Sequence, residues 1–91
     1  MIINAEFKWN GQDIHLTCDE DKLDRNYDDE ETAYFIQFLV VGADSGRFFE
    51  VNIERNMDTG ELTEKGYVTY YLSLDDSRPH KIINNVKIYF T

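Results

Sequence analysis

The sequence predicts a mainly β protein, either a compact six-stranded antiparallel barrel or a two-layer sandwich. Three features of the sequence support this fold class. Apolar and polar residues alternate along most of the chain, turn-forming residues separate the alternating segments, and one fully apolar segment is rich in aromatic and β-branched residues. The 91 residues fit a single domain, residues 1–91, with a thin hydrophobic core.

The first two strands are predicted on either side of Asn10-Gly11. This pair favours the positive φ angles of a type I′ turn, which joins two adjacent antiparallel strands. Both flanking segments alternate with a period of two, so each has one apolar face and one wet face. The predicted apolar face consists of Ile3, Ala5, Phe7, Trp9, Ile14, Leu16 and Cys18.

Residues 32–41 are apolar on every face, and we expect them to form a central strand covered on both sides. A short helix near residues 28–41 is the alternative, and it would make the fold α+β. The acids at residues 28–31 suit the first turn of a helix, and Gly42 suits its end. The aromatic and β-branched residues between them are poor helix formers, so the strand is favoured.

Further turns are predicted at residues 44–46, 56–60 and 75–79, where Gly, Asn, Asp and Pro occur. The strand after the first of these turns has one solvated face. The strand after the second has an aliphatic face and a tyrosine-rich face, and a last strand follows the third turn. The inward positions of these strands are Phe49, Val51, Ile53, Val68, Tyr70, Leu72, Leu74, Val86, Ile88 and Phe90.

The chain has the composition of a cytoplasmic protein. Its single cysteine, Cys18, cannot form a disulfide within the chain, which suits a reducing compartment. The first ten residues alternate and carry charges, unlike a signal peptide. The longest uncharged apolar stretch, residues 32–43, is far shorter than the about 20 residues of a membrane-spanning helix. We therefore expect no membrane partner.

Catalytic and metal-binding motifs are not recognisable in the sequence. His15 and Cys18 lie three positions apart on a predicted strand, so they should point to opposite faces, and His80 adds no paired motif. Adjacent acids such as Asp75 and Asp76 lie in turns, where two carboxyl groups rarely acquire divergent pKa values. The sequence therefore predicts no enzyme, no metal and no cofactor.

One stretch of the chain has the spacing of a calcium loop. Asp24, Asn26 and Asp28 match the first oxygen ligands of such a loop. Asp29 stands where the loop needs a glycine, and Phe35 stands where it needs a glutamate. We therefore expect a solvated loop rather than a dedicated calcium site.

Negative charge is the strongest functional signal. Eighteen acids against nine bases give a net charge of −9, which disfavours direct binding to nucleic acid or anionic lipid. Residues 19–31 contain eight of these acids and two bases. The candidate partner-binding residues, with the tyrosine as an apolar anchor, are Asp19, Glu20, Asp21, Asp24, Tyr27, Asp28, Asp29, Glu30 and Glu31.

The leading hypothesis is a small acidic binding protein that blocks a basic surface, with carboxylates in place of nucleic acid phosphates. The expected partner is a nuclease or another nucleic-acid-binding effector, as for a phage anti-defence inhibitor or a toxin immunity protein. A structural or assembly domain whose acids maintain solubility is the main alternative. A sugar-binding β-sandwich that uses Tyr67 and Tyr71 is a weaker one. These two tyrosines and Tyr89 are expected to share an outward face, where their rings could contact a protein or a sugar. Exposed strand edges leave a homodimer open.

Overall fold

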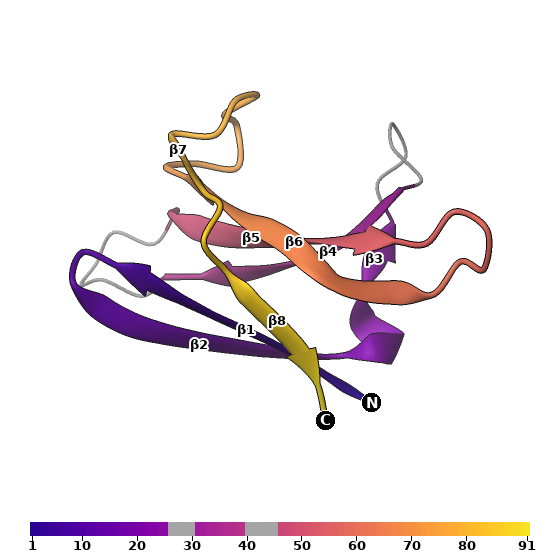
Figure 1. Ribbon diagram of the computed structural model, residues 1–91. Coiled ribbons are helices and arrows are strands. Elements are labelled where there is room, and N and C mark those ends of the chain that lie inside the picture. The colour runs from indigo at the N-terminus through magenta and orange to yellow at the C-terminus, as the bar shows by residue number, and fades with distance from the viewer. Residues whose placement is uncertain (26–30, 40–45) are drawn as a thin grey trace.

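Two antiparallel sheets pack against each other in the computed structural model, which describes residues 1–25, 31–39 and 46–91 (Figure 1). The small sheet has the strand order β2-β1-β8 and consists of β1 (Ile2–Trp9), β2 (Gln12–Asp19) and β8 (Lys87–Phe90). The large sheet has the order β3-β4-β5-β6-β7 and consists of β3 (Asp24–Arg25), β4 (Thr32–Phe38), β5 (Phe48–Arg55), β6 (Leu62–Tyr71) and β7 (Lys81–Ile83). A 3₁₀ turn, η1 (Glu20–Lys22), connects β2 to β3. The predicted mainly β class is confirmed, and the described strands fit a sandwich rather than a closed barrel.

The first hairpin forms as the sequence predicts. β1 and β2 pair along their whole length. Asn10 and Gly11 have φ angles of 50° and 79°, which are the positive values that a type I′ turn requires. Asparagine adopts this backbone conformation more readily than other residues with a side chain, so the pair Asn10-Gly11 fixes both the turn and the strand register.

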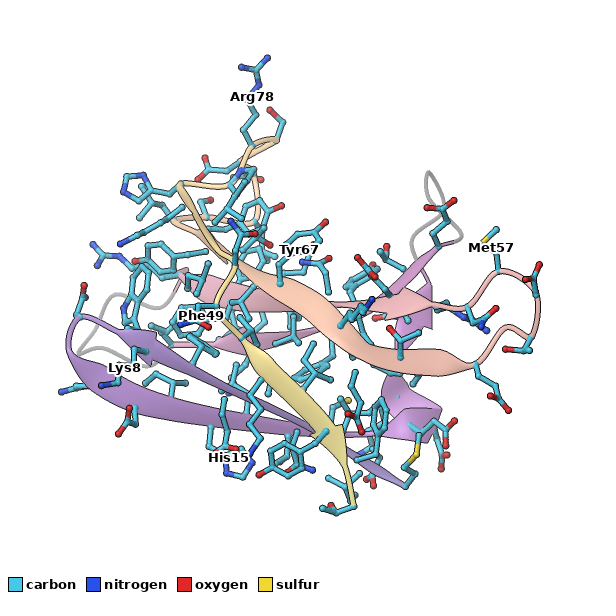
Figure 2. The ribbon with its side chains drawn as sticks, viewed as in Figure 1. Lys8, His15, Phe49, Met57, Tyr67 and Arg78 are labelled. Carbon is cyan, nitrogen blue, oxygen red and sulfur yellow. The ribbon has the colours of Figure 1, made fainter. Side chains whose placement is uncertain are left out.

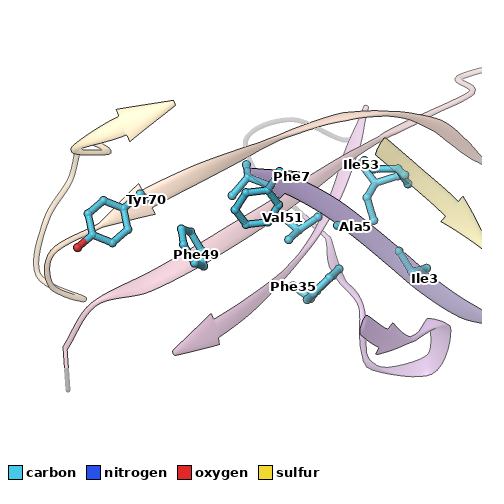
Figure 3. Packing of buried hydrophobic residues seen from close by; sticks show 10 residues of the cluster. Ile3, Ala5, Phe7, Phe35, Phe49, Val51, Ile53 and Tyr70 are labelled. Atoms are coloured by element: carbon cyan, nitrogen blue, oxygen red, sulfur yellow. The ribbon is translucent and has the colours of Figure 1, made fainter. Parts of the chain in front are cut away.

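The hydrophobic core lies between the two sheets (Figure 3). Phe7 of the small sheet meets Phe49 of the large sheet edge to face, with ring centroids 5.1 Å apart. Trp9 contacts the same ring at 5.3 Å and Tyr70 at 4.5 Å. Such aromatic pairs stabilise the contact beyond the apolar area they bury. The buried core consists of Ile3, Ala5, Phe7, Phe35, Phe49, Val51, Ile53, Val68, Tyr70 and Ile88.

A glycine permits the closest approach of the strands. Gly66 of β6 pairs with Ile53 of β5. A Cβ atom at this position would overlap the backbone carbonyl of Asn52 and press on the side chain of Ile88 in β8. The absence of a side chain at Gly66 is therefore what lets β5, β6 and β8 meet where the sheets are in contact.

Residues 32–38 form strand β4, which confirms the predicted strand over the helix for this described segment. The expectation that it is covered on both sides is wrong. Ala33 and Phe35 are buried against the core, but Ile36 and Phe38 on the opposite face are 39% and 41% exposed. An all-apolar pattern looks the same whether its second face is covered or open, which explains the error.

The described residues form eight strands where the sequence predicted six, because β3 and β7 are too short to show alternation. β6 ends at Tyr71, so Leu72 and Leu74 are exposed instead of belonging to an inward aliphatic face. The last strand also departs from hairpin order, because β8 returns to pair with β1. The backbone N–H of Ile2 donates to the carbonyl of Thr91 at 2.8 Å, so the terminal strands pair within one chain.

Candidate partner-binding site

The acidic segment begins at one end of the sandwich, where β2 leads into η1 and β3. Figure 1 shows this end beside the β5–β6 loop and away from the β1–β2 turn. In Figure 2, Met57 of the β5–β6 loop and Lys8 near the β1–β2 turn lie at opposite ends of the molecule. The exposed carboxylates of this segment belong to Asp19, Glu20, Asp21 and Asp24.

Backbone hydrogen bonds hold this segment in place. Asp19 pairs with Ile2 in the hairpin, and the N–H of Glu20 donates to the carbonyl of Met1 at 3.1 Å. The N–H of Leu23 closes the 3₁₀ turn onto the carbonyl of Glu20 at 3.2 Å, and the Leu23 side chain packs against the core. The side chain of Asp19 makes no capping hydrogen bond, so its carboxylate is not used by the turn.

The thiol of Cys18 lies next to the acidic segment, and two of these acids affect its pKa. Burial raises the pKa of Cys18, the negative charges of Asp19 and Asp24 raise it further, and Lys22 opposes them. Asp19 and Asp24 thus both contribute negative potential at this thiol. A raised pKa keeps the thiol protonated near neutral pH, which makes it a poor nucleophile.

A groove of about 640 Å³ opens beside this segment, bordered by residues of both sheets. Glu20 and Leu23 line it from the η1 side, and Glu61 lines it from the β5–β6 loop. Arg55 also lines the groove, but its Nε and Nη2 atoms donate to the carbonyl of Gly60 at 3.1 and 2.7 Å and hold it against the loop. We call the exposed carboxylates around this groove the acidic end: Asp19, Glu20, Asp21, Asp24 and Glu61.

Four predicted site residues lie outside the described part of the chain: Tyr27, Asp28, Asp29 and Glu30. The calcium-like spacing also falls partly on these undescribed residues. Glu31, the last residue of the predicted set, is exposed and immediately precedes β4. Its carbonyl accepts a hydrogen bond of 2.6 Å from the N–H of Arg55, which places Glu31 next to the end of β5.

The histidine and cysteine side chains have structural contacts. His15 and Cys18 point to opposite faces of β2, as their spacing predicts, with His15 exposed and Cys18 packed against the core. The Nε2 atom of His15 lies 2.9 Å from Oδ1 of Asn4. His80 packs against the ring of Tyr70, with centroids 5.9 Å apart. Within the described ranges, no group of three or more His, Cys, Asp or Glu side chains is arranged to hold a metal.

The structure also reveals a surface that the sequence did not predict, on the outer face of the large sheet. Side chains alternate along each strand, so the residues next to the core positions of β4, β5 and β6 point away from the small sheet. Cross-strand pairing arranges them in rows. The rows are Phe38, Phe48 and Tyr71; Ile36, Glu50, Thr69 and Ile82; and Tyr34, Asn52 and Tyr67.

Apolar side chains make up much of this outer face. The ring of Phe48 stacks on Tyr71 with centroids 4.9 Å apart and planes 10° apart, and it contacts Phe38 at 5.6 Å. Phe48 is buried by these neighbours although it points away from the core, while Ile82 at the sheet edge is 53% exposed. Ile36, Phe38 and Ile82 are thus exposed large apolar side chains on one face, although Glu50 and Thr69 separate Ile82 from the other two. Exposed apolar side chains gathered on one face are typical of contact sites.

Glu50 lies at the centre of this outer face, half-buried on strand β5. Burial raises the pKa of Glu50, and a hydrogen bond with the Asn52 side chain partly opposes that shift. Burial also raises the pKa of Tyr71, and the charge of Glu50 raises it further. The carboxylate is therefore close to the Tyr71 ring, in a site that water reaches only in part. Alternation alone places Glu50 on a solvated face, so its burial was not evident from the sequence.

The predicted tyrosine face is partly wrong. Tyr67 and Tyr71 do share the outer face of the large sheet, but Tyr89 belongs to β8 in the small sheet. There its ring stacks on His15 with centroids 6.2 Å apart, and the ammonium of Lys87 lies 5.2 Å from the ring centroid. Alternation gives the face of a residue within its own strand but not the sheet that the strand joins.

Across the part of the chain that the structure describes, no helix has the length and apolar character needed to cross a lipid bilayer. Comparison with protein-family models, with curated proteins and with solved structures finds no match to this chain. The molecule therefore offers two candidate contact surfaces, the acidic end and the outer face of the large sheet.

Proposed function

We propose that this protein is a non-catalytic binding protein that blocks a basic, nucleic-acid-binding surface of another protein. The observation that carries the proposal is the acidic end, whose carboxylates are exposed on hydrogen-bonded backbone. Asp19 and Glu20 are bonded to residues 1–2, Asp24 pairs with β4, and the carbonyl of Glu61 accepts from the N–H of Asn56. Carboxylates and phosphates are both anionic hydrogen-bond acceptors, so a basic surface built for phosphates also accepts fixed carboxylates.

The net charge of −9 supports the same proposal through the rate of encounter. Attraction between opposite potentials accelerates association by about 10- to 1,000-fold, and the effect decreases as salt rises. Such acceleration is largest when the charges are concentrated where the partner docks. The acidic end meets that condition, because Glu20 and Glu61 line the same groove from different segments.

The groove also has apolar side chains in its lining. Leu23 and Leu62 are half-buried in its lining beside Glu20 and Glu61. A partner lysine or arginine that enters the groove would place its alkyl stem on the leucines and its charged group near the carboxylates. This contact is expected to slow dissociation, whereas the carboxylates outside the groove mainly set the association rate.

Two biological settings share this physics: a phage inhibitor of a bacterial defence nuclease, and an immunity protein that neutralises a nuclease toxin. Both need a partner whose basic surface normally holds nucleic acid. The alternative function is a structural or assembly domain whose acids maintain solubility. That alternative predicts no stable cationic partner, so the two are separable by experiment.

Affinity capture followed by binding kinetics tests the proposal. The immobilised protein should capture a strongly basic protein from a lysate of its host, and nucleic acid should compete for that partner. Replacing Asp19→Asn, Glu20→Gln, Asp21→Asn and Asp24→Asn together should slow association at low salt by about tenfold or more. Dissociation should change less than association, because three of the four carboxylates lie outside the groove and Glu61 remains in it.

A charge-matched variant controls for net charge. Glu6→Gln, Asp13→Asn, Asp75→Asn and Asp76→Asn remove the same number of acids from other regions of the chain. With both variants also measured at about 0.15 M salt, the association rate of this control should stay within about threefold of the original protein, since screening then limits charge effects to about 8 Å. Equal losses in both variants, or a partner that binds equally well without the acidic end, would contradict the proposal.

A further inference from the structure

Apolar and neutral polar side chains flank the Glu50 carboxylate on the outer face of the large sheet. Glu50 lies opposite Ile36 of β4 on one side and Thr69 of β6 on the other. Side chains paired in this way have Cβ atoms about 5 Å apart. Phe48 precedes Glu50 on the same face of β5, and its ring is stacked on Tyr71. The closest lateral neighbours of the carboxylate are therefore apolar or neutral.

The charge on Glu50 has no cationic counterpart among the described groups that act on it. Burial is the main influence on the pKa of Glu50, and the Asn52 side chain is the group that opposes it. A half-buried carboxylate without a cation destabilises the folded protein. Residues that break a stability rule in this way are concentrated at binding sites.

The other acids on this face have the same sign and lie around its margin. Strand pairing places Asp24 of β3 opposite Tyr34, and Glu54 of β5 opposite Thr32, both on the face that carries Glu50. The face therefore combines exposed apolar side chains with negative charge. A cation on an apolar segment complements this combination, because guanidinium and ammonium groups pair with carboxylates and also pack on aromatic rings.

We infer that the outer face of the large sheet docks a protein segment that carries an arginine or lysine between apolar residues. The cation pairs with Glu50, and the flanking apolar side chains cover Ile36, Phe38 and Ile82. Asp24 belongs to both surfaces, so this contact is continuous with the acidic end. Apart from Asp24, the two surfaces consist of different side chains, and the contact at Glu50 does not depend on the proposed function of the acidic end.

A second copy of this chain is a poorer occupant of the same face. An interface with twofold symmetry brings the same patch of each copy together. Centred on this face, it would place two Glu50 carboxylates close to each other, with Asp24 and Glu54 of both copies at its rim. Like charges repel each other strongly in a site that excludes water, whereas a cationic partner would form an ion pair with the Glu50 carboxylate.

A short peptide titration tests the inference without knowledge of the natural partner. The probe is acetyl-Leu-Arg-Leu-amide, added to isotopically labelled protein and followed by two-dimensional NMR. The peptide should shift the methyl signals of Ile36 and Ile82 and the signals of Thr69, with an apparent dissociation constant on the order of millimolar. The same peptide with citrulline in place of arginine has nearly the same shape but no charge, and it should cause no such shifts.

Matched variants assign the contact to one carboxylate. Glu50→Gln keeps the size of the side chain, and it should weaken binding of the arginine peptide by about tenfold or more. Glu54→Gln removes an exposed charge from the same face of the same strand, and it should weaken binding by less than about threefold. A variant that lacks the acids at residues 19, 20 and 21 but keeps Asp24 should retain the shifts at Ile36 and Ile82.

Four results would overturn the inference. One is unchanged binding in Glu50→Gln, and another is a set of shifts confined to the acidic end. The third is a neutral disaccharide that shifts the Ile36 and Ile82 signals when the arginine peptide does not, which would assign the face to sugar. The last is movement of those signals on dilution of the free protein, which would assign the face to a second copy.

Discussion

The two outer faces of the sandwich lie on sheets built with the same alternation, yet their chemistry differs. On the small sheet, Lys87, Glu6 and His15 lie side by side across β8, β1 and β2. On the outer face of the large sheet, the row at the middle of the strands places Ile36 of β4 beside Glu50 of β5. The small sheet thus places opposite charges side by side, whereas the large sheet flanks the Glu50 carboxylate with uncharged side chains.

The two outer faces also differ in the partners of a polar side chain that has limited exposure to water. Asn4 of the small sheet is 5% exposed, and its amide donates to the Tyr89 carbonyl at 3.3 Å and to Oγ1 of Thr91 at 3.2 Å. The Nε2 atom of His15 forms a further hydrogen bond with Oδ1 of Asn4. The charge of Glu50 has no comparable set of partners. On the large sheet, the buried side chains of Asn52 and Thr69 are also hydrogen-bonded, to each other and to the carbonyl of Glu50. The difference between the faces is therefore confined to the half-buried charge of Glu50.

Gly66→Ala is expected to have the largest effect on stability, because Gly66 lies where the two sheets are in contact. The added methyl group would overlap the backbone of Asn52 and press on Ile88, so we expect a loss of about 3 kcal/mol in the free energy of unfolding. Urea denaturation measures this loss. Gly46→Ala is the control, since a Cβ there meets only an ordinary contact of 3.5 Å with the Leu72 carbonyl. Equal stability of the two variants would show that the strands do not approach closely at Gly66.

A slightly smaller effect should separate the two faces directly. Phe48→Ala removes a buried ring from the outer face of the large sheet, where Tyr71 and Phe38 pack on it. We expect the free energy of unfolding to fall by about 2–3 kcal/mol. Thr17→Ala on the outer face of the small sheet removes an exposed side chain, and it should change stability by less than about 0.5 kcal/mol. Similar changes for the two variants would mean that the outer faces are alike.

The smallest effect should come from Glu50→Gln, and it should have the opposite sign at neutral pH. Burial raises the folded-state pKa of Glu50 above its ordinary value of 4.5, so the unfolded chain loses this proton at lower pH than the folded chain. The folded state is therefore penalised as pH rises through 4.5 and beyond, and the penalty is complete above the raised pKa. Urea unfolding should find Glu50→Gln more stable than the original protein at pH 7.

Two comparisons check that pH dependence. Below the ordinary pKa of 4.5, both the folded and unfolded states keep the Glu50 proton, so the gain from Glu50→Gln should disappear. Glu6→Gln on the small sheet lies between Lys87 and His15 and should bring no gain in stability at pH 7. A gain that persists at low pH would mean that the burial of the Glu50 charge is not its source.

Local features of the fold could be predicted from the sequence. Asn10-Gly11 determines the first hairpin because few residues accept two successive positive φ angles. Alternation identifies the inward positions of β1 and β5, since a period of two assigns each residue to a face. The exposed acids of the candidate site were also predictable, because carboxylates seldom lose their contact with water.

Features that depend on distant parts of the chain could not be predicted. The pairing of β8 with β1 joins the two ends of the sequence, and nothing local in either strand specifies its partner. The groove forms because η1 and the β5–β6 loop meet in space, so Glu61 had no signal linking it to residues 19–24. The outer face of the large sheet was missed because Ile36 and Phe38 have the composition of a covered strand.

The most direct test of this account is carboxyl labelling of the protein, free and bound to the cationic partner obtained by affinity capture. Carbodiimide coupling modifies exposed carboxylates, and mass spectrometry measures the extent at each residue. The account predicts that the partner lowers labelling of Glu20, Glu61 and Glu50, and leaves Glu6 and Asp13 of the small sheet unchanged. Reduced labelling of Glu6 and Asp13, with Glu20 and Glu50 unaffected, would contradict it.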